Sequence, residues 1–353
     1  MAKPTTSKYH FETGAYRPPS EGGSYSLLLR FTRNCPWNRC GFCGMYKTEK
    51  FELRPVAEIK SDIDAMAAIC NDLKEIAMKM GNGGQVGQEA ALALMGRFPE
   101  LNYHQGFVML YHWLISGGKT AFLQDANSLI MKTDQLVEAL QHLRKTFPSL
   151  ERVTTYARSK TIARKSSEEL AAIRAAGLDR LHVGLESGDH EVLNMIKKGA
   201  TPESHIKGGR KALEAGFQLS EYWMPGLGGK AMWHNHAVNT ARVLNAINPH
   251  YIRSRPFHPW EGTPLTEALL NGDFQMLTPD EQLMELKITM ENLEVTSKVC
   301  FDHAGNYWKN RQGDHLFSLS YEGYRFPDQK SQVLALIDDG LSAGNQRPRF
   351  LWL

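Results

Sequence analysis

Residues 33–44 have the sequence Arg-Asn-Cys-Pro-Trp-Asn-Arg-Cys-Gly-Phe-Cys-Gly, so three of the chain's five cysteines lie within one short segment. Cys35, Cys40 and Cys43 are separated by four and then two residues, among Gly and Pro that allow sharp turns. Three thiolates so close together are typical of an iron–sulfur cluster or a zinc site, because both select soft sulfur ligands. The segment therefore predicts a metal site.

The fourth ligand distinguishes the two metals. Structural zinc usually takes a closed set of four ligands, with a second Cys or His pair, and this chain has no second CxxC motif. His10 and His104 could each supply one ligand, but neither belongs to a pair. A 4Fe–4S cluster with one open iron explains the count better and implies a small-molecule ligand. A zinc knuckle or a group of free thiols is the alternative.

The two other cysteines, Cys70 and Cys300, lie far from the three in sequence and are expected to be small buried hydrophobic residues. Five cysteines, without a signal peptide or an apolar run long enough to cross a membrane, predict a cytoplasmic protein. The net charge of +3 gives no clear nucleic-acid signal, because it supplies no dense basic stripe. The charge therefore neither excludes a nucleic-acid partner nor indicates one, and no membrane partner is expected.

The length of 353 residues fits a barrel of about 250 residues with additions, or two separate domains. Residues 1–23, rich in Pro, Ser, Gly and Thr, predict an irregular arm. The apolar run 25–32 predicts a first strand that ends at the cysteines, where a barrel active site would lie. Helical spacing then predicts an insertion at about 54–118, with a second helix from near Gln88, which we interpret as a cover for the barrel.

From residue 120, strands and helices alternate as in parallel β/α units, which predicts an α/β fold with six strands. Further strands are expected at 120–124, 152–157, 181–185, 218–224 and 251–257, and helices at 134–145, 167–176 and 202–215. Gly177 and Gly216 are expected to end two of these helices, and Ser166 or Ser167 to cap one. Residues 271–353 predict a mainly helical C-terminal extension to the 24–270 core.

The cysteine segment resembles the cluster loop of the radical S-adenosylmethionine (radical SAM) superfamily. Phe42 occupies that loop's aromatic position, although the commonest spacing in the superfamily is three and then two residues. Residues 181–188, Leu-His-Val-Gly-Leu-Glu-Ser-Gly, continued by 192–201, resemble the fourth-strand signature in the branch that contains oxygen-independent coproporphyrinogen oxidase. Six strands are also the number in this family's partial (β/α)6 TIM-like barrel.

The resemblance implies that Cys35, Cys40 and Cys43 hold a 4Fe–4S cluster, and that S-adenosylmethionine (SAM) chelates the fourth iron. It implies an oxygen-sensitive enzyme that receives electrons from a donor such as flavodoxin or ferredoxin and acts on a small-molecule substrate. The radical expected from resemblance alone is 5′-deoxyadenosyl. The longer cysteine loop leaves open a 3-amino-3-carboxypropyl radical, and a non-enzymatic zinc or iron–sulfur module is a further alternative.

The strand ends carry candidate SAM ligands. Gln124, Asp125 and Asn127 match by position the family segment that accepts hydrogen bonds from the methionine amine, although an Asx turn is an alternative there. Glu186 and Ser187 resemble the family's ribose-facing pair, although a charged residue at a strand end can also mark only an exit to solvent.

Three arginines at strand ends are candidates for binding a carboxylate of SAM or substrate, namely Arg158, Arg253 and Arg255, because a buried guanidinium requires a partner. The sequence does not distinguish among them. The loop 224–229, Met-Pro-Gly-Leu-Gly-Gly, resembles a family loop whose backbone approaches the cofactor. Asp302 and His303 are weak catalytic candidates, with a solvated turn as the alternative.

Overall fold

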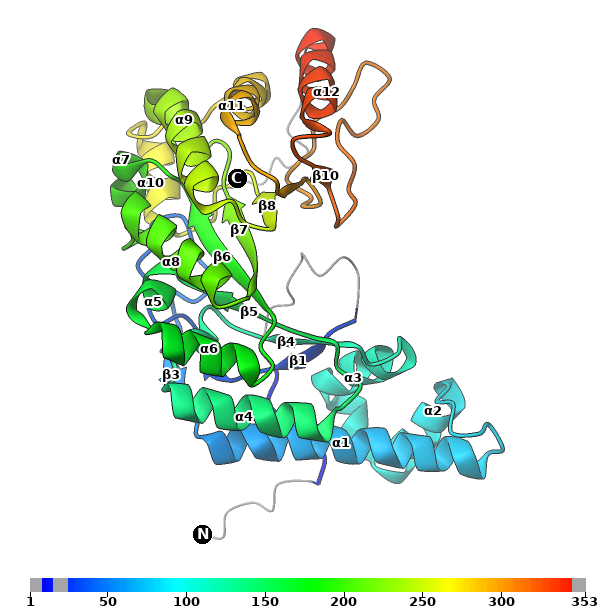
Figure 1. The fold of residues 1–353 in the computed structure, drawn as a ribbon. Coiled ribbons are helices and arrows are strands. Elements are labelled where there is room, and N and C mark those ends of the chain that lie inside the picture. Colours follow the sequence, from blue (N-terminus) through cyan, green and yellow to red (C-terminus); the bar gives the residue numbers. More distant parts are fainter. Residues whose placement is uncertain (1–7, 15–24, 345–353) are drawn as a thin grey trace. The chain divides into compact units, whose positions relative to one another are not determined.

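The computed structural model describes residues 8–14 and 25–344, which form two compact units (Figure 1). Of the described residues, the first unit contains those up to Asn34, Phe51–Tyr156 and Ala171–Arg180, and the second contains Cys35–Lys50, Ala157–Leu170 and those from Leu181 onward. The chain therefore passes between the units several times, and the three cysteines all belong to the second.

The elements that precede the change of unit near residue 157 are β1 (Leu27–Leu29), β2 (Thr32–Arg33), β3 (Glu52–Leu53), α1 (Val56–Lys79), α2 (Gln88–Arg97), the 3-10 helix η1 (Pro99–Tyr103), α3 (Gln105–Ile115), β4 (Thr120–Leu123), the 3-10 helix η2 (Ser128–Ile130), α4 (Thr133–Thr146) and β5 (Arg152–Ala157). The later elements are α5 (Ser159–Arg164), α6 (Ser167–Ala175), β6 (Arg180–Glu186), α7 (His190–Met195), α8 (Pro202–Glu214), β7 (Gln218–Trp223), α9 (Gly229–Ile247), β8 (Tyr251–Ser254), α10 (Pro264–Asn271), α11 (Pro279–Asn292), β9 (Lys298–Cys300), β10 (Tyr324–Arg325) and α12 (Lys330–Ala343).

Parallel pairing dominates both units. In the first, β1 pairs with β4 and β4 with β5, with Phe122 opposite both Leu28 and Thr154. In the second, β7 pairs with β8 and β8 with β9, so that Arg253 lies opposite Tyr222 and Cys300. The predicted α/β class is confirmed, because parallel strands alternate with helices, a helical insertion follows the first strand, and α11 and α12 dominate the extension.

The extension also contributes two strands that the sequence did not predict. Strand β9 adds a parallel neighbour to β8, and β10 pairs with β9 in the antiparallel direction. Both strands are shorter than the four residues from which hydrophobic periodicity can be recognised. The six strands predicted for the core are therefore present, and the extension adds two more.

The predicted helix ends at Gly177, Gly216 and Ser166 are confirmed. Gly177 and Gly216 have φ values of 103° and 81°, the left-handed conformation that ends a helix at low cost for glycine. Ser166 caps the helix that follows it, since its hydroxyl accepts a hydrogen bond from the amide of Glu169 at 3.1 Å. The second helix of the insertion begins at Gln88, as predicted.

The described part of the N-terminal arm, residues 8–14, is irregular as predicted but firmly attached to the first unit. Tyr9 and Phe11 are buried, and the Tyr9 hydroxyl bonds to Asp72 on α1 at 2.5 Å. The rest of the predicted arm lies outside the described residues.

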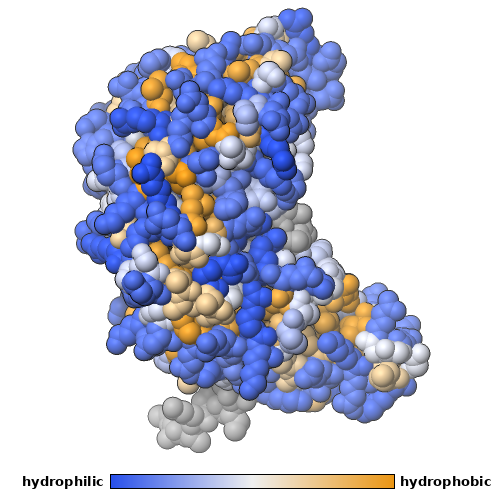
Figure 2. Space-filling model, viewed as in Figure 1, coloured by the Kyte–Doolittle hydropathy of each residue, from blue (hydrophilic) through white to orange (hydrophobic). Residues whose placement is uncertain are grey.

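The helical insertion carries exposed apolar side chains. Leu92, Tyr103 and Val108 are each more than half exposed, and Figure 2 shows apolar side chains over the α2 and α3 part of the first unit. Among the described helices, none combines the length and the apolar character that crossing a bilayer requires.

Candidate functional site

The cysteine loop is anchored through its backbone within the second unit. The Gly41 amide donates to the carbonyl of Ile196 at 2.7 Å, and the Gly41 carbonyl accepts from the amide of Leu265 at 2.9 Å. Gly41 lies between Cys40 and Cys43, so these two bonds fix the central part of the loop between the end of α7 and the start of α10. The middle of the loop is thus held by backbone hydrogen bonds on both sides.

The longer first gap between the cysteines contains a left-handed residue, Asn38. Asn38 adopts a left-handed φ of 46°, which asparagine tolerates better than most residues, and its side chain donates to the Tyr46 carbonyl. The preceding residue, Trp37, donates from its indole nitrogen to the Lys197 carbonyl at 2.8 Å. A Cβ at Gly199 would lie 2.2 Å from the Trp37 ring, so glycine there permits the indole to pack against the backbone.

Two cations lie near the thiols. Arg158 stacks on Trp37, with 4.9 Å between its guanidinium carbon and the ring centroid, and donates to the Lys198 carbonyl at 2.7 Å. Burial raises the pKa of the Cys40 thiol, and the charges of Lys198 and Arg158 partly offset that effect. Both cations would stabilise a thiolate or an anionic cluster by the same electrostatics.

All three cysteines of the loop are free and half-buried, whereas Cys70 and Cys300 are buried as predicted, and burial raises the pKa of each to about 12. No group of three His, Cys, Asp or Glu side chains in the described parts of the chain meets the geometry for holding a metal ion. The donor set nevertheless fits a cluster, because three free thiols share one anchored loop beside two cations.

Phe42 packs against an apolar cluster rather than standing free beside the cysteines. The buried members of this cluster are Val192, Ile196, Met224, Leu227, Phe257, Leu265 and Phe274. These residues come from α7, from the loop after β7 and from the region around α10. Through this cluster, Phe42 gives the cysteine loop apolar packing against residues that include those of the loop after β7.

Glu186 is held in a costly conformation at the end of β6. Its φ of 62° is rare for a non-glycine residue, and such conformations cluster at functional sites. The Glu186 carboxylate accepts from Lys198 at 2.8 Å. Gly184 makes room for this pair, since a Cβ there would lie 2.2 Å from the Glu186 carboxylate. Burial lowers the pKa of Lys198, but Glu186 and Cys40 raise it by more, so Lys198 stays charged.

Ser187, the other predicted ribose ligand, is fully buried. Its hydroxyl lies 2.8 Å from Nδ1 of His236 and accepts from the amide of Asp189 at 2.9 Å. In the structure, therefore, this hydroxyl orders the loop after β6.

The predicted amine ligands lie at the end of β4 in the first unit, and two of them have well-defined partners there. Gln124 accepts from the amide of Gly14 at 2.9 Å, and Asp125 pairs with Arg30 at 2.6 Å. Asn127 is fully buried in the same segment. Asp125 has a φ of 66°, a second costly conformation at a strand end.

The arginines at the end of β8 differ in their pairing. Arg253 is buried, pairs with Asp302 at 3.0 Å and lies over the Tyr321 ring at 3.9 Å from its centroid. No carboxylate of the described residues pairs with Arg255 at salt-bridge distance. Burial, and then the charge of Arg255, lowers the pKa of nearby His303 to about 4, so this imidazole is neutral near pH 7. Asp302 is thus a partner of Arg253 rather than of the adjacent His303.

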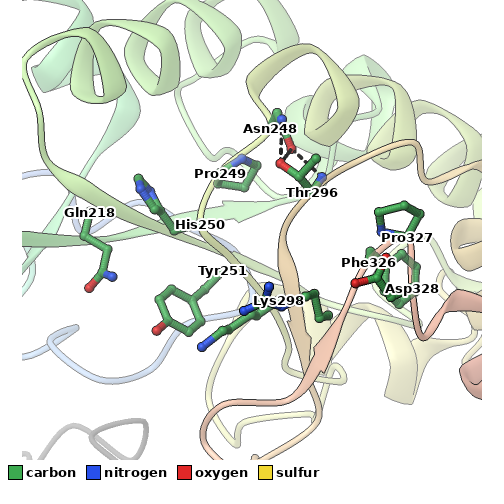
Figure 3. Close-up of a pocket in the computed structure, with 11 residues that line it drawn as sticks. Gln218, Asn248, Pro249, His250, Tyr251, Thr296, Lys298, Phe326, Pro327 and Asp328 are labelled. Atoms are coloured by element: carbon green, nitrogen blue, oxygen red, sulfur yellow. Dashed lines mark hydrogen bonds between the residues drawn. The ribbon is translucent and has the colours of Figure 1, made fainter.

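A cavity of about 560 Å³ opens at the opposite end of the strands in the second unit (Figure 3). Its lining includes Gln218, His250 and Lys298, at or next to the amino ends of β7, β8 and β9. None of the predicted site residues lines it. Because active sites of parallel β/α folds lie at the carboxyl ends of the strands, we do not assign the predicted chemistry to this cavity.

Part of the chain matches the model of a known protein family. Residues 110–237, which begin after the cysteine loop and include Glu186, match the family model described as the radical SAM superfamily. The predicted resemblance to the radical SAM superfamily is confirmed. Members of this superfamily are enzymes, and the matched residues make up about a third of this chain.

Individual relatives are distant. The tRNA uridine(34) acetyltransferase of Methanocaldococcus infernus is 25% identical over 119 residues, which cover 33% of this chain and 22% of that protein. Among solved structures, the archaeal Methanocaldococcus infernus Elp3 has a TM-score of 0.47 at 15% identity, covering 70% of this chain and 60% of its own. Coproporphyrinogen III oxidase (HemN) from Escherichia coli has a TM-score of 0.45 at 14% identity, covering 75% and 51%.

Proposed function

We propose that the chain is a radical SAM enzyme in which Cys35, Cys40 and Cys43 hold the cluster and SAM is cleaved to a 5′-deoxyadenosyl radical that acts on a small-molecule substrate. The observation that carries this proposal is the anchored cysteine loop with three free thiols. When bound, the cluster supplies the electron that cleaves a carbon–sulfur bond of SAM.

The chain's own residues orient and isolate the reaction. Lys198 and Arg158 place positive charge beside the cysteine loop, and Glu186 balances Lys198 while offering an acceptor at the strand end. Arg255, which pairs with no carboxylate among the described residues, is the arginine best suited to receive the SAM carboxylate. Arg253 serves less well because Asp302 already pairs with it.

The predicted radical is testable through the nucleoside product. The expectation of adenosyl cleavage comes from the resemblance to the superfamily, and the left-handed φ of Asn38 is the local feature of the longer first gap that could affect it. Anaerobic incubation with SAM and a reductant is expected to yield 5′-deoxyadenosine, identified by chromatography of the quenched reaction. An excess of methylthioadenosine would instead favour the 3-amino-3-carboxypropyl radical.

The variant Glu186→Gln is expected to bind SAM about tenfold more weakly, because it removes a charged acceptor and leaves Lys198 without its carboxylate partner. Its iron content should match that of the wild type, since Glu186 is not a proposed ligand of iron. Calorimetry on reconstituted protein measures the affinity. The exposed Glu191 on α7 supplies the control Glu191→Gln, and equal SAM affinity of the two variants would contradict the role of Glu186.

A further inference from the structure

Two buried ionisable side chains connect the loops that follow β6 and β7. His236 on α9 and Glu285 on α11 are both fully buried. Such groups require hydrogen-bond partners, since a buried donor or acceptor without a partner costs about 1–3 kcal/mol. Their partners identify the part of the molecule that they hold in place.

The hydrogen bonds of His236 have a fixed direction. Nε2 lies 3.0 Å from the Met224 carbonyl, which can only accept, so Nε2 carries the proton. Nδ1 must then accept from the Ser187 hydroxyl, 2.8 Å away. Ser187 in turn accepts from the amide of Asp189. One neutral imidazole thus joins the loop after β6 to the loop after β7, and burial, which lowers the pKa of His236 to about 4, keeps it neutral.

Glu285 holds the second of these loops from the C-terminal extension. Its Oε1 accepts from the Gly226 amide at 2.8 Å and lies 3.6 Å from Nε2 of His236. Gly226 has a φ of 84°, a conformation that favours glycine and that this bond helps to fix. Burial raises the pKa of Glu285 to about 8, so the carboxyl is neutral near pH 7 beside a neutral imidazole.

Helix α9 supports the first loop at two more points. The Gly188 amide donates to the Thr240 hydroxyl at 2.9 Å, and Asn239 donates to the Asp189 carboxylate at 2.7 Å. A Cβ at Gly188 would lie 2.3 Å from the Asn239 carbonyl oxygen, so the loop rests directly on the helix backbone. The loop that begins with Glu186 is therefore a rigid part of the second unit.

We propose that His236 and Glu285 are positioning residues, which set the loop 186–189 and the loop 224–226 in the arrangement that receives SAM. This inference rests on the proposed function, because it assigns these loops to the SAM site. Neither side chain is expected to touch SAM. Their effect is transmitted through Ser187, Met224 and Gly226, whose backbone and side-chain positions they determine.

The test uses the full chain and two matched variants. His236→Phe removes both bonds of the imidazole, whereas His205→Phe removes another fully buried imidazole whose nitrogens have no hydrogen-bond partner among the described residues. Amide hydrogen exchange of the unloaded protein should accelerate at 186–189 and 224–226 in His236→Phe only. Calorimetry on reconstituted protein should show SAM affinity lowered about tenfold in that variant only, with iron content at the wild-type level.

A second pair separates positioning from general stability. Glu285→Leu removes the acceptor for the Gly226 amide and should lower SAM affinity about fivefold, whereas Glu285→Gln keeps an acceptor and should recover most of that loss. Equal exchange rates and SAM affinities in His236→Phe and His205→Phe would overturn the proposed role. Failure of the wild type to bind SAM would instead overturn the proposed function.

Discussion

Alanine at Cys35, Cys40 or Cys43 is expected to abolish nearly all cluster binding, whereas alanine at Cys70 or Cys300 leaves the iron content close to that of the wild type. Each thiol of the first group belongs to the anchored loop, and a site with only three protein ligands has none to spare. Even residues outside the ligand set typically change metal affinity by about 10–100-fold, so removing a ligand should cost more. Iron and sulfide per chain are measured after anaerobic reconstitution.

The buried cysteines serve as matched controls, because the same atom is removed away from the loop. Loss of iron from Cys300→Ala as complete as that from Cys40→Ala would contradict the assignment. Zinc without sulfide in the wild type would favour a non-enzymatic metal-binding module over an enzyme.

Replacing Glu285 by Gln is expected to change how stability depends on pH. In the folded chain, burial raises the pKa of Glu285 to about 8 from the ordinary 4.5, so between these values the unfolded state ionises and the folded state does not. Unfolding then releases a proton, and the free energy of unfolding falls by about 1.4 kcal/mol per pH unit over this window. At pH 8 the buried Glu285 therefore lowers the free energy of unfolding by about 5 kcal/mol compared with its value at acidic pH.

The variant Glu285→Gln should lack this contribution, and so should gain stability over the wild type progressively from pH 5 to pH 8. Denaturant unfolding at several pH values measures the difference. The exposed Glu291 on the same helix provides the control Glu291→Gln, whose pH profile should follow that of the wild type. Parallel profiles for wild type and Glu285→Gln would show that the carboxyl ionises in the folded state as it does in water.

Local pattern was sufficient to locate the six core strands and the helices α4, α6 and α8, but not the long helix α9. The residues of β5 coincide with the predicted strand 152–157, because the consecutive residues Val, Thr, Thr and Tyr are all of types that favour strands. Gly177 and Gly216 end their helices because glycine alone adopts the left-handed conformation at low cost, which a single residue in the sequence reveals. Strands β9 and β10 were missed because their pairing with β8 and with each other, rather than their own composition, makes them strands.

The site was less predictable, because its side chains are directed by residues distant in sequence. The sequence grouped Glu186 with Ser187 as ligands of the ribose. In the structure, Nδ1 of His236, on a later helix, accepts a hydrogen bond from the Ser187 hydroxyl. Likewise Asp125 was predicted from its position at a strand end, and its pairing with Arg30 depends on how two strands align. The cysteine loop was recognisable because its three cysteines are close in sequence, and a sequence motif is defined by such short spacings.

The attachment of Gly41 constrains the order of events during biosynthesis. Its two backbone partners, Ile196 and Leu265, are synthesised long after the cysteines have left the ribosome. A nascent chain that ends before Leu265 therefore exposes three thiols on a segment without its supports, open to oxidation or to scavenging of other metals. A cluster that is delivered to the anchored loop therefore requires a chain that has been synthesised at least through Leu265.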